Sequence, residues 1–159
     1  MKKQIATVAA LLLCGAAIAD WKYQIDKNLM TDEVYSTFAA IENPTQPFGK
    51  INVINRKESG FEVSITNDAS TIDCPSPSCR ILVRFDDNAP IWFQVKPALS
   101  IFFYIINTDE FVHLARKARR IRVQANFMPK EGLSWSGEQV MEFKATQPLV
   151  VQPLVKGLK

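Results

Sequence analysis

The sequence is poor in the residues that most catalytic and phosphate-binding motifs require. It has one histidine, His113, together with three cysteines and six scattered glycines among 159 residues. No glycine-rich loop is present to surround a phosphate. Nothing in the sequence around His113 suggests a Ser–His or Cys–His nucleophile pair. We therefore expect His113 to be a surface or flanking residue.

The sequence also lacks a large excess of charge of either sign. The sequence has 19 Lys and Arg against 16 Asp and Glu. Loss of the leader described below would remove Lys2 and Lys3 and leave 17 basic residues against 16 acidic ones. A net charge near +1 does not indicate binding to nucleic acid. The 47% of apolar residues and a mature length of about 140 residues suit one globular domain.

The N-terminus has the pattern of a secretory signal peptide. Lys2 and Lys3 form a positive start, residues 5–18 form an uncharged and largely apolar stretch, and Ala17-Ile18-Ala19 is a small-x-small cleavage site before Asp20. The apolar run of about 15 residues is shorter than the roughly 20 that span a bilayer. We expect residues 1–19 to be removed and the mature chain to be periplasmic.

Three other outcomes remain open for the leader and the compartment. The leader could stay uncleaved as an anchor, the protein could be secreted, or Cys14 could be lipidated as in bacterial lipoproteins, although Leu13 stands where those have a small residue. In the rest of the chain, the most apolar window, residues 91–106, is interrupted by polar residues and a proline. We therefore expect no transmembrane segment in the mature chain.

The two cysteines of the mature chain lie close together. Cys74 and Cys79 are separated by Pro75-Ser76-Pro77-Ser78, and in an oxidising compartment this spacing predicts a disulfide that pins a loop. Redox motifs have two intervening residues rather than four. A zinc site would need more Cys or His ligands than this pair and one distant His. We expect no metal and no cofactor.

Alternation at period two predicts that residues 20–146 form a single β-rich domain. The stretch Asn55–Gly60 predicts a hairpin turn, and the two aromatic runs 91–95 and 101–106 are typical of central, buried strands divided by Lys96-Pro97. The expected strands, about eight in number, fall in these segments: 21–25, 35–41, 51–53 with 61–65, 81–85, 91–95, 101–106, 121–127 and 141–145.

One segment has the period of a helix instead. From Asp109 to Ala118, the apolar residues Phe111, Leu114 and Ala115 recur at helical spacing, and Asn107 or Thr108 could cap the first turn. Together with the alternation, this predicts a mainly β fold: an antiparallel β-sandwich or barrel-like fold with one short amphipathic helix.

A basic cluster and a tryptophan are candidates for contact with a partner. A basic cluster after the helix either completes the helix end and solvates the surface or binds lipid phosphates or an acidic protein. Trp135 stands in a polar loop and is either a contact anchor or a cover for one end of the sandwich. The cluster consists of Arg116, Lys117, Arg119, Arg120 and Arg122.

The C-terminal tail, residues 147–159, carries a short repeat. Gln147-Pro148-Leu149-Val150 recurs as Gln152-Pro153-Leu154-Val155, and prolines at this spacing exclude a central strand. The tail is either an edge strand that frays or a docking segment whose Leu149, Val150, Leu154 and Val155 add to the sheet of a partner.

Adjacent carboxylates raise one enzymatic alternative. Asp86 and Asp87 are expected in a hairpin turn, where such residues are common. A cell-wall glycan hydrolase could also use two carboxylates at a suitable separation. A third class of function, transport of a small apolar ligand inside a barrel, stays open because the sequence does not separate a cavity from a filled core.

The order of these features resembles a group of exported proteins. Trp21 follows the cleavage site, Asp26 to Met30 form an Asp-x-x-x-Met segment, and the cysteine pair leads into residues 80–87, before a helix and closing strands. This layout resembles small periplasmic proteins of Gram-negative bacteria, many of them uncharacterised. It is also similar to the invasion-associated locus B family and to accessory proteins of secretion systems. The resemblance spans Trp21 to Ala145, implies the periplasm and a sandwich, and brings no catalytic residues.

These observations together favour a non-enzymatic protein. We expect an exported periplasmic binding or interaction protein, acting as an accessory, inhibitor or immunity-type factor of the cell envelope or of a secretion system. Its partner would be an envelope or secreted protein. The expected contacts are loops and an exposed sheet edge, with the disulfide holding one loop in place.

Overall fold

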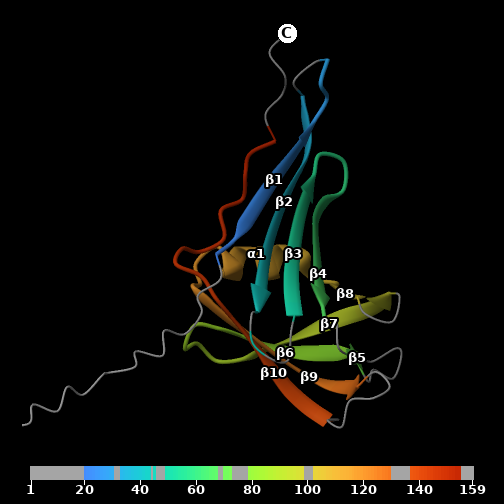
Figure 1. The fold of residues 1–159 in the computed structure, drawn as a ribbon, viewed down its shortest axis with the longest axis vertical. Coiled ribbons are helices and arrows are strands. Elements are labelled where there is room, and N and C mark those ends of the chain that lie inside the picture. The colour runs from blue at the N-terminus through green and yellow to red at the C-terminus, as the bar shows by residue number, and fades with distance from the viewer. Residues whose placement is uncertain are drawn as a thin grey trace, which may run out of the picture.

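The computed structural model describes most of the chain beyond the predicted leader. The described residues are 20–30, 33–43, 45, 49–67, 70–72, 79–98, 102–129 and 137–154. They form ten strands and one short helix, drawn in Figure 1. In chain order these are β1 (Lys22–Lys27), β2 (Val34–Asn43), β3 (Gly49–Arg56), β4 (Gly60–Thr66), β5 (Ser70–Ile72), β6 (Arg80–Phe85), β7 (Ile91–Ala98), β8 (Phe102–Ile105), α1 (Thr108–Ala115), β9 (Arg120–Pro129) and β10 (Gly137–Lys144).

All ten strands belong to one antiparallel sheet. Nine of them follow the order β1-β2-β3-β4-β8-β7-β6-β9-β10, and β5 pairs with β9 beside this path. The sheet is open, because in the part of the chain that the structure describes β1 pairs only with β2 and β10 only with β9. The hairpin expected at Asn55–Gly60 is present, with Arg56 opposite Gly60 at its end.

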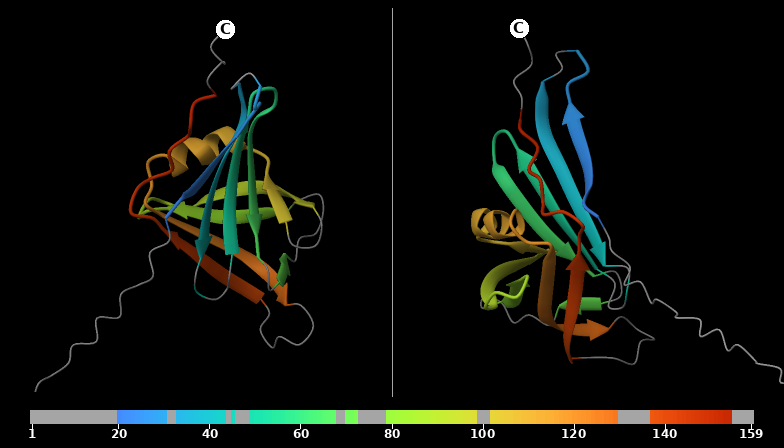
Figure 2. Two further views of the ribbon diagram at one scale, coloured as in Figure 1. Left: turned by 45° about the horizontal axis from the view of Figure 1, so that its top comes forward. Right: turned by 90° about the vertical axis from the view of Figure 1, so that its left-hand side faces the viewer.

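The sheet bends along β7, and the bend brings its two halves face to face. Residues Ile91–Gln94 of β7 pair with β6, whereas Val95–Ala98 pair with β8. A strand that passes from one layer to the other in this way forms a corner between them. Figure 2 shows β1 to β4 rising from one side of the bend and β6, β9 and β10 crossing on the other.

The core lies between the two halves because alternate residues of each strand face it. On one half, Ile51, Val63 and Ile65 have no exposed surface, and on the other Val123 and Phe143 have none. These side chains belong to one continuous hydrophobic cluster. The alternate apolar residues that the sequence analysis identified are thus the ones that form the core.

The helix α1 completes this core. Phe111 is fully buried, and its ring makes edge-on contacts with Phe85 and Phe93 at centroid distances of 5.3 and 5.6 Å. The helix ends at Ala115, earlier than the expected Ala118. Asn107 is the N-cap residue, but its side chain donates to the Glu110 carboxylate at 2.6 Å instead of accepting a backbone N–H.

The described chain ends are held against the body. Asp20 accepts hydrogen bonds from Thr146, just after β10, and Trp21 is only 8% exposed. The backbone N–H of Leu149 donates to the Ala115 carbonyl, and Leu149 is 2% exposed. The tail then passes beside β1 in Figure 1, where the Val150 N–H donates to the Tyr23 hydroxyl at 3.0 Å.

The predicted fold class is confirmed: the described protein is mainly β and antiparallel, with one short helix. Three local expectations were wrong. Strand β5 was not foreseen, β7 continues through Pro97, and the run 91–106 is not buried throughout, since Trp92 and Ile106 are 56% and 61% exposed. Pro97 fits because the β6 pairing stops at Gln94, which leaves one side of β7 without a ladder to disrupt.

Candidate functional site

The β1–β2 hairpin carries exposed apolar side chains in its turn and near the end of β1, which we call the hairpin patch: Ile25, Leu29 and Met30. Their exposed fractions are 50%, 87% and 92%. Two hydrogen bonds join described residues here: the Asn28 N–H donates to the Glu33 carbonyl at 2.9 Å, and the Met30 N–H donates to the Asn28 side chain at 2.8 Å. Apolar side chains grouped on an exposed surface are typical of interaction sites.

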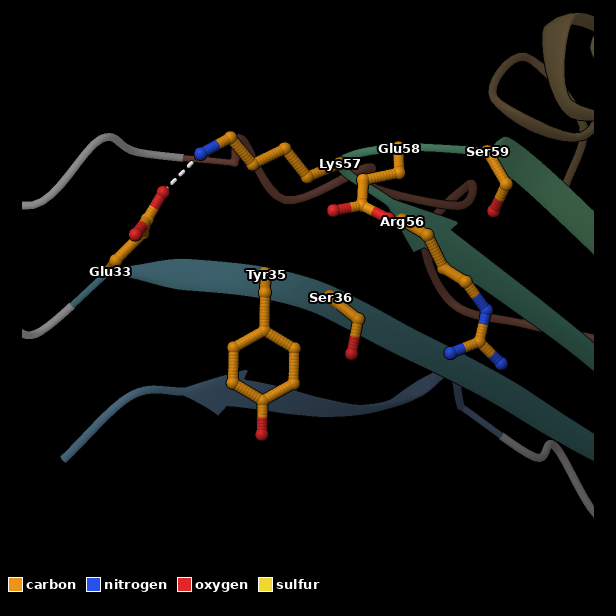
Figure 3. A pocket seen from close by; sticks show the side chains of 7 residues that line it. All are labelled: Glu33, Tyr35, Ser36, Arg56, Lys57, Glu58 and Ser59. Atoms are coloured by element: carbon orange, nitrogen blue, oxygen red, sulfur yellow. Dashed lines mark hydrogen bonds and ion pairs between the residues drawn. The ribbon is translucent and has the colours of Figure 1, made fainter.

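A groove of about 440 Å³ lies beside this patch, between the start of β2 and the β3–β4 turn. We call it the tip groove. Figure 3 shows its side chains, which come from two segments far apart in the sequence. Its lining residues are Glu33, Tyr35, Ser36, Arg56, Lys57, Glu58 and Ser59.

The tip groove carries both charge signs and one exposed aromatic ring. Tyr35 is 53% exposed, while its carbonyl accepts the Lys57 N–H at 3.1 Å and fixes the two segments together. Lys57 also forms an ion pair with Glu33, marked by the dashed line in Figure 3. The Ser36 hydroxyl donates to Asp26 at 2.8 Å.

The predicted basic cluster divides into two members that contact acidic residues and three that are exposed. Arg122 donates to the Asp86 carbonyl at 2.9 Å and to the Asp87 carboxylate at 3.1 Å, and Arg120 forms an ion pair with Asp87. Both arginines also lie about 4 Å from Glu142, too far for a hydrogen bond. Arg120 and Arg122 thus bind acidic residues and a carbonyl of their own protein.

The other three members, Arg116, Lys117 and Arg119, are exposed. Lys117 and Arg119 line an open groove of about 520 Å³ together with Asp86, Asp87 and Lys144. The Lys117 ammonium lies 2.8 Å from the His113 ring, which is exposed as expected. Arg120 also lines this groove, so four basic residues face two carboxylates and basic charge is in excess. Binding of an acidic group by this cluster stays a prediction.

Asp86 and Asp87 hold the β6–β7 turn, as expected from the sequence. Asp86 has a φ of 50°, and one of its carboxylate oxygens accepts the backbone N–H groups of Arg119 and Arg120 at 3.0 and 2.9 Å. With Asp87 occupied by two arginines, this carboxylate pair has structural partners. It gives no support to a hydrolase that uses these two residues.

Three of the candidate residues lie outside the described residues: Cys74, Trp135 and Val155. Cys79 is buried and disulfide-bonded, and its pairing with Cys74 stays a prediction. A different tryptophan, Trp92 of β7, is exposed. The Arg80 guanidinium stacks on its ring at 4.6 Å from the ring centroid.

The tail residues proposed for docking differ in how far they are exposed. Leu149 belongs to the core cluster and is therefore occupied by its own protein, which corrects its assignment as a partner contact. Val150 is 50% exposed, Leu154 is half-buried, and Val155 lies outside the described residues. The tail is not a strand in its described part, 147–154.

The space between the tail and the inner face of β1 to β4 is nearly filled. Its volume is about 10 Å³, with Leu149 on one side and Ala39 and Val53 on the other. A volume of this size holds one water at most. This space therefore offers no room for a small apolar ligand.

Two further observations concern metals and membranes. Within the described ranges, no group of three or more His, Cys, Asp or Glu side chains is arranged to hold a metal ion. No helix in the same ranges has the length and apolar character needed to cross a membrane.

No protein-family model, curated protein or solved structure matches this chain. The resemblance to exported Gram-negative proteins accordingly stays a prediction. The hairpin patch and the tip groove were both missed by the sequence analysis. The available signal was the pair Leu29-Met30, two large apolar residues within an otherwise polar turn.

Proposed function

We propose that this chain is an exported, non-enzymatic interaction protein of the cell envelope, which binds an envelope or secreted protein through the hairpin patch. The observation that carries the proposal is the exposure of Leu29 and Met30, at 87% and 92%. Large apolar side chains of this kind can serve as anchors in a pocket of a partner.

Charge around the patch favours a protein over a lipid surface. Lys27 and Lys57 are accompanied by the carboxylates of Asp26 and Glu33, and Lys57 is already paired with Glu33. A loop that binds anionic lipid headgroups needs an excess of basic residues. An apolar centre with a rim of both signs is instead the composition of a protein interface.

The edge of the sheet offers a second element of the same contact. In the described part of the chain, β1 pairs with β2 on one side only. A free strand edge presents backbone donors and acceptors to which an extended segment of another protein can add. The hairpin patch and this edge belong to the same hairpin, so one partner could use both.

The start of the folded body supports the export part of the proposal. Asp20, which would follow the predicted cut after Ala19, is hydrogen-bonded to Thr146, and Trp21 packs into the core. Cleavage at this point would leave every described element intact. The predicted Cys74–Cys79 disulfide also requires an oxidising compartment.

Site-specific photo-crosslinking in intact cells tests the proposal. A crosslinking amino acid at position 30 is compared with one at position 106, because Ile106 is also 61% exposed but lies far along the chain, after β8. The product specific to position 30 is identified by mass spectrometry, and its partner is purified. We expect Leu29→Ser/Met30→Ser to weaken the affinity for this partner at least about tenfold, while Ile106→Ser leaves it unchanged.

The proposal is overturned if position 30 gives no product beyond that of position 106. It is also overturned if the purified partner binds the double variant as tightly as it binds the natural protein. N-terminal sequencing of the protein from the periplasmic fraction checks the export step separately, with Asp20 expected as the first residue.

A further inference from the structure

We infer that the tip groove is a binding site for a neutral saccharide, a second site beside the hairpin patch. The groove has a volume of about 440 Å³ and opens to solvent between β2 and the β3–β4 turn. This volume lies within the range of small-ligand sites and suits a few sugar units.

Tyr35 provides the apolar platform of the site. A sugar ring has one face of C–H groups, which packs on an aromatic ring, while its hydroxyls need hydrogen bonds around the edge. Tyr35 leaves 53% of its surface exposed, and its hydroxyl adds one polar group at the edge of the ring. The Tyr35 carbonyl accepts the hydrogen bond from the Lys57 N–H, and this bond holds the Tyr35 backbone next to the β3–β4 turn.

Polar side chains with few internal partners line the groove together with this ring. In the described part of the chain, the side chains of Glu58 and Ser59 make no hydrogen bond or ion pair, and both are exposed. The Arg56 guanidinium has one contact, at 4.0 Å from Glu62, which is beyond hydrogen-bond distance. Figure 3 shows Arg56, Glu58 and Ser59 on β3 and the β3–β4 turn, and Tyr35 and Ser36 on the neighbouring strand β2. These groups supply an acceptor, a hydroxyl and several donors for ligand hydroxyls.

The charge of the groove selects a neutral ligand. Arg56 and Lys57 are balanced by Glu33 and Glu58, and Lys57 is paired with Glu33. A phosphate or nucleic acid would require an excess of cations, and a purely apolar ligand would leave the charged side chains desolvated without partners. A polyhydroxylated ligand with one apolar face satisfies both the ring and the charged rim.

The experiment titrates the isotopically labelled full chain with three neutral tetrasaccharides at millimolar concentration: β-1,4-linked N-acetylglucosamine, cellotetraose and maltotetraose. We expect at least one of them to shift the amide signals of Tyr35, Arg56 and Ser59 in a saturable way. The fitted affinity should stay constant as ionic strength rises from about 0.05 to 0.5 M, because screening does not weaken contacts to a neutral ligand.

Variants separate this site from other exposed aromatic surface. Tyr35→Ala should weaken binding at least tenfold and Glu58→Ala several-fold, with unchanged melting temperatures. Trp92→Ala, which removes an exposed ring on the other half of the sheet, should bind as the natural protein does. Leu29→Ser/Met30→Ser should also keep full saccharide binding, so loss of the protein partner and loss of the saccharide are distinguishable.

The inference is overturned if none of the three saccharides shifts these amides, or if folded Tyr35→Ala binds as tightly as the natural protein. An affinity that falls steeply with salt would equally overturn it, because it would show that charge rather than the hydroxyl and ring contacts holds the ligand.

Discussion

One carboxylate oxygen of Asp20 accepts two hydrogen bonds from Thr146, from its backbone N–H at 2.9 Å and its hydroxyl at 2.6 Å. The two residues are 126 positions apart in the sequence. This contact fixes the first described residue to the segment that follows the last strand, β10. It therefore ties the start of the fold to the point where the tail begins.

The contact predicts a pH dependence of stability. The Thr146 hydroxyl, followed by its backbone N–H, holds the pKa of Asp20 below its ordinary value of 3.8. A carboxyl with a lowered pKa in the folded state stabilises the protein above its unfolded pKa, and this contribution is lost as pH falls through the folded pKa. Thr146→Val should therefore melt at a lower temperature than the natural protein at pH 6, and the gap should narrow as pH falls below the ordinary pKa of 3.8.

Circular dichroism melts from pH 7 to pH 2.5 measure this gap. Ser59→Ala serves as the control, because the Ser59 hydroxyl has no hydrogen bond among the described residues. Its melting temperature should follow that of the natural protein at every pH. A Thr146→Val gap that stays constant across the range would contradict the role of Asp20.

The basic cluster should respond differently at two neighbouring positions. Arg122 bonds the Asp86–Asp87 turn and lies near Glu142, so Arg122→Glu removes these contacts and places like charges together. We expect the free energy of unfolding in urea to fall by about 1–2 kcal/mol.

Arg119→Glu is the matched variant for this test. The Arg119 side chain is exposed, and only its backbone N–H bonds Asp86. Its free energy of unfolding should stay within about 0.5 kcal/mol of the natural value. Equal losses at the two positions would mean that net charge, rather than the contacts of Arg122, controls stability.

The surroundings of Gly49 leave no room for a larger side chain at this position. A Cβ at this position would clash with the sulfur of Met141 and lie 3.1 Å from the Thr66 carbonyl oxygen. Because Met141 is fully buried, Gly49→Ala should destabilise the protein by about 1–3 kcal/mol.

A double-mutant cycle identifies the clash. Met141→Ala alone should cost about 2–5 kcal/mol. In the double variant the new methyl group enters space left by Met141, so the loss should be smaller than the sum by about 1 kcal/mol. Strict additivity in urea unfolding would show that Met141 is not what limits the residue at position 49.

The tail should contribute to stability through one residue. Leu149 is 2% exposed, so Leu149→Ala should lower the free energy of unfolding by about 2–5 kcal/mol. Val150→Ala changes an adjacent side chain that is 50% exposed and should cost less than about 1 kcal/mol. If both variants unfold at the same urea concentration as the natural protein, the tail is not part of the core.

Several elements could be predicted from the sequence because their signals are local. The alternation of Ile51 and Val53 with polar neighbours depends only on which side chains face the core, and the spacing of Phe111 and Ala115 predicts a helix for the same reason. Strand β5 has three residues and no pattern of its own, and it forms only because β9 lies beside it. The extent of β7 likewise depends on where its neighbours stop.

The candidate sites were mostly beyond prediction, and particular residues show why. Tyr35 and Glu58 are 23 positions apart, and only the pairing of β2 with β3 brings them to one groove. The basic residues were visible as a cluster, yet the sequence did not tell that Asp87 neutralises Arg120 and Arg122 while Arg119 stays exposed. Partners of this kind are set by strand register across the sheet.

The sequence by itself determined the class of fold, since periodicity states which side of each strand and helix is apolar, and burial of apolar surface drives folding. The tertiary structure decided the order of the strands, the bend along β7 and the fate of each exposed group. Leu149 and Met30 are both large apolar residues flanked by a polar or proline-rich sequence. One lies in the core and the other is 92% exposed, because only long-range packing determines which apolar side chain finds a space to fill.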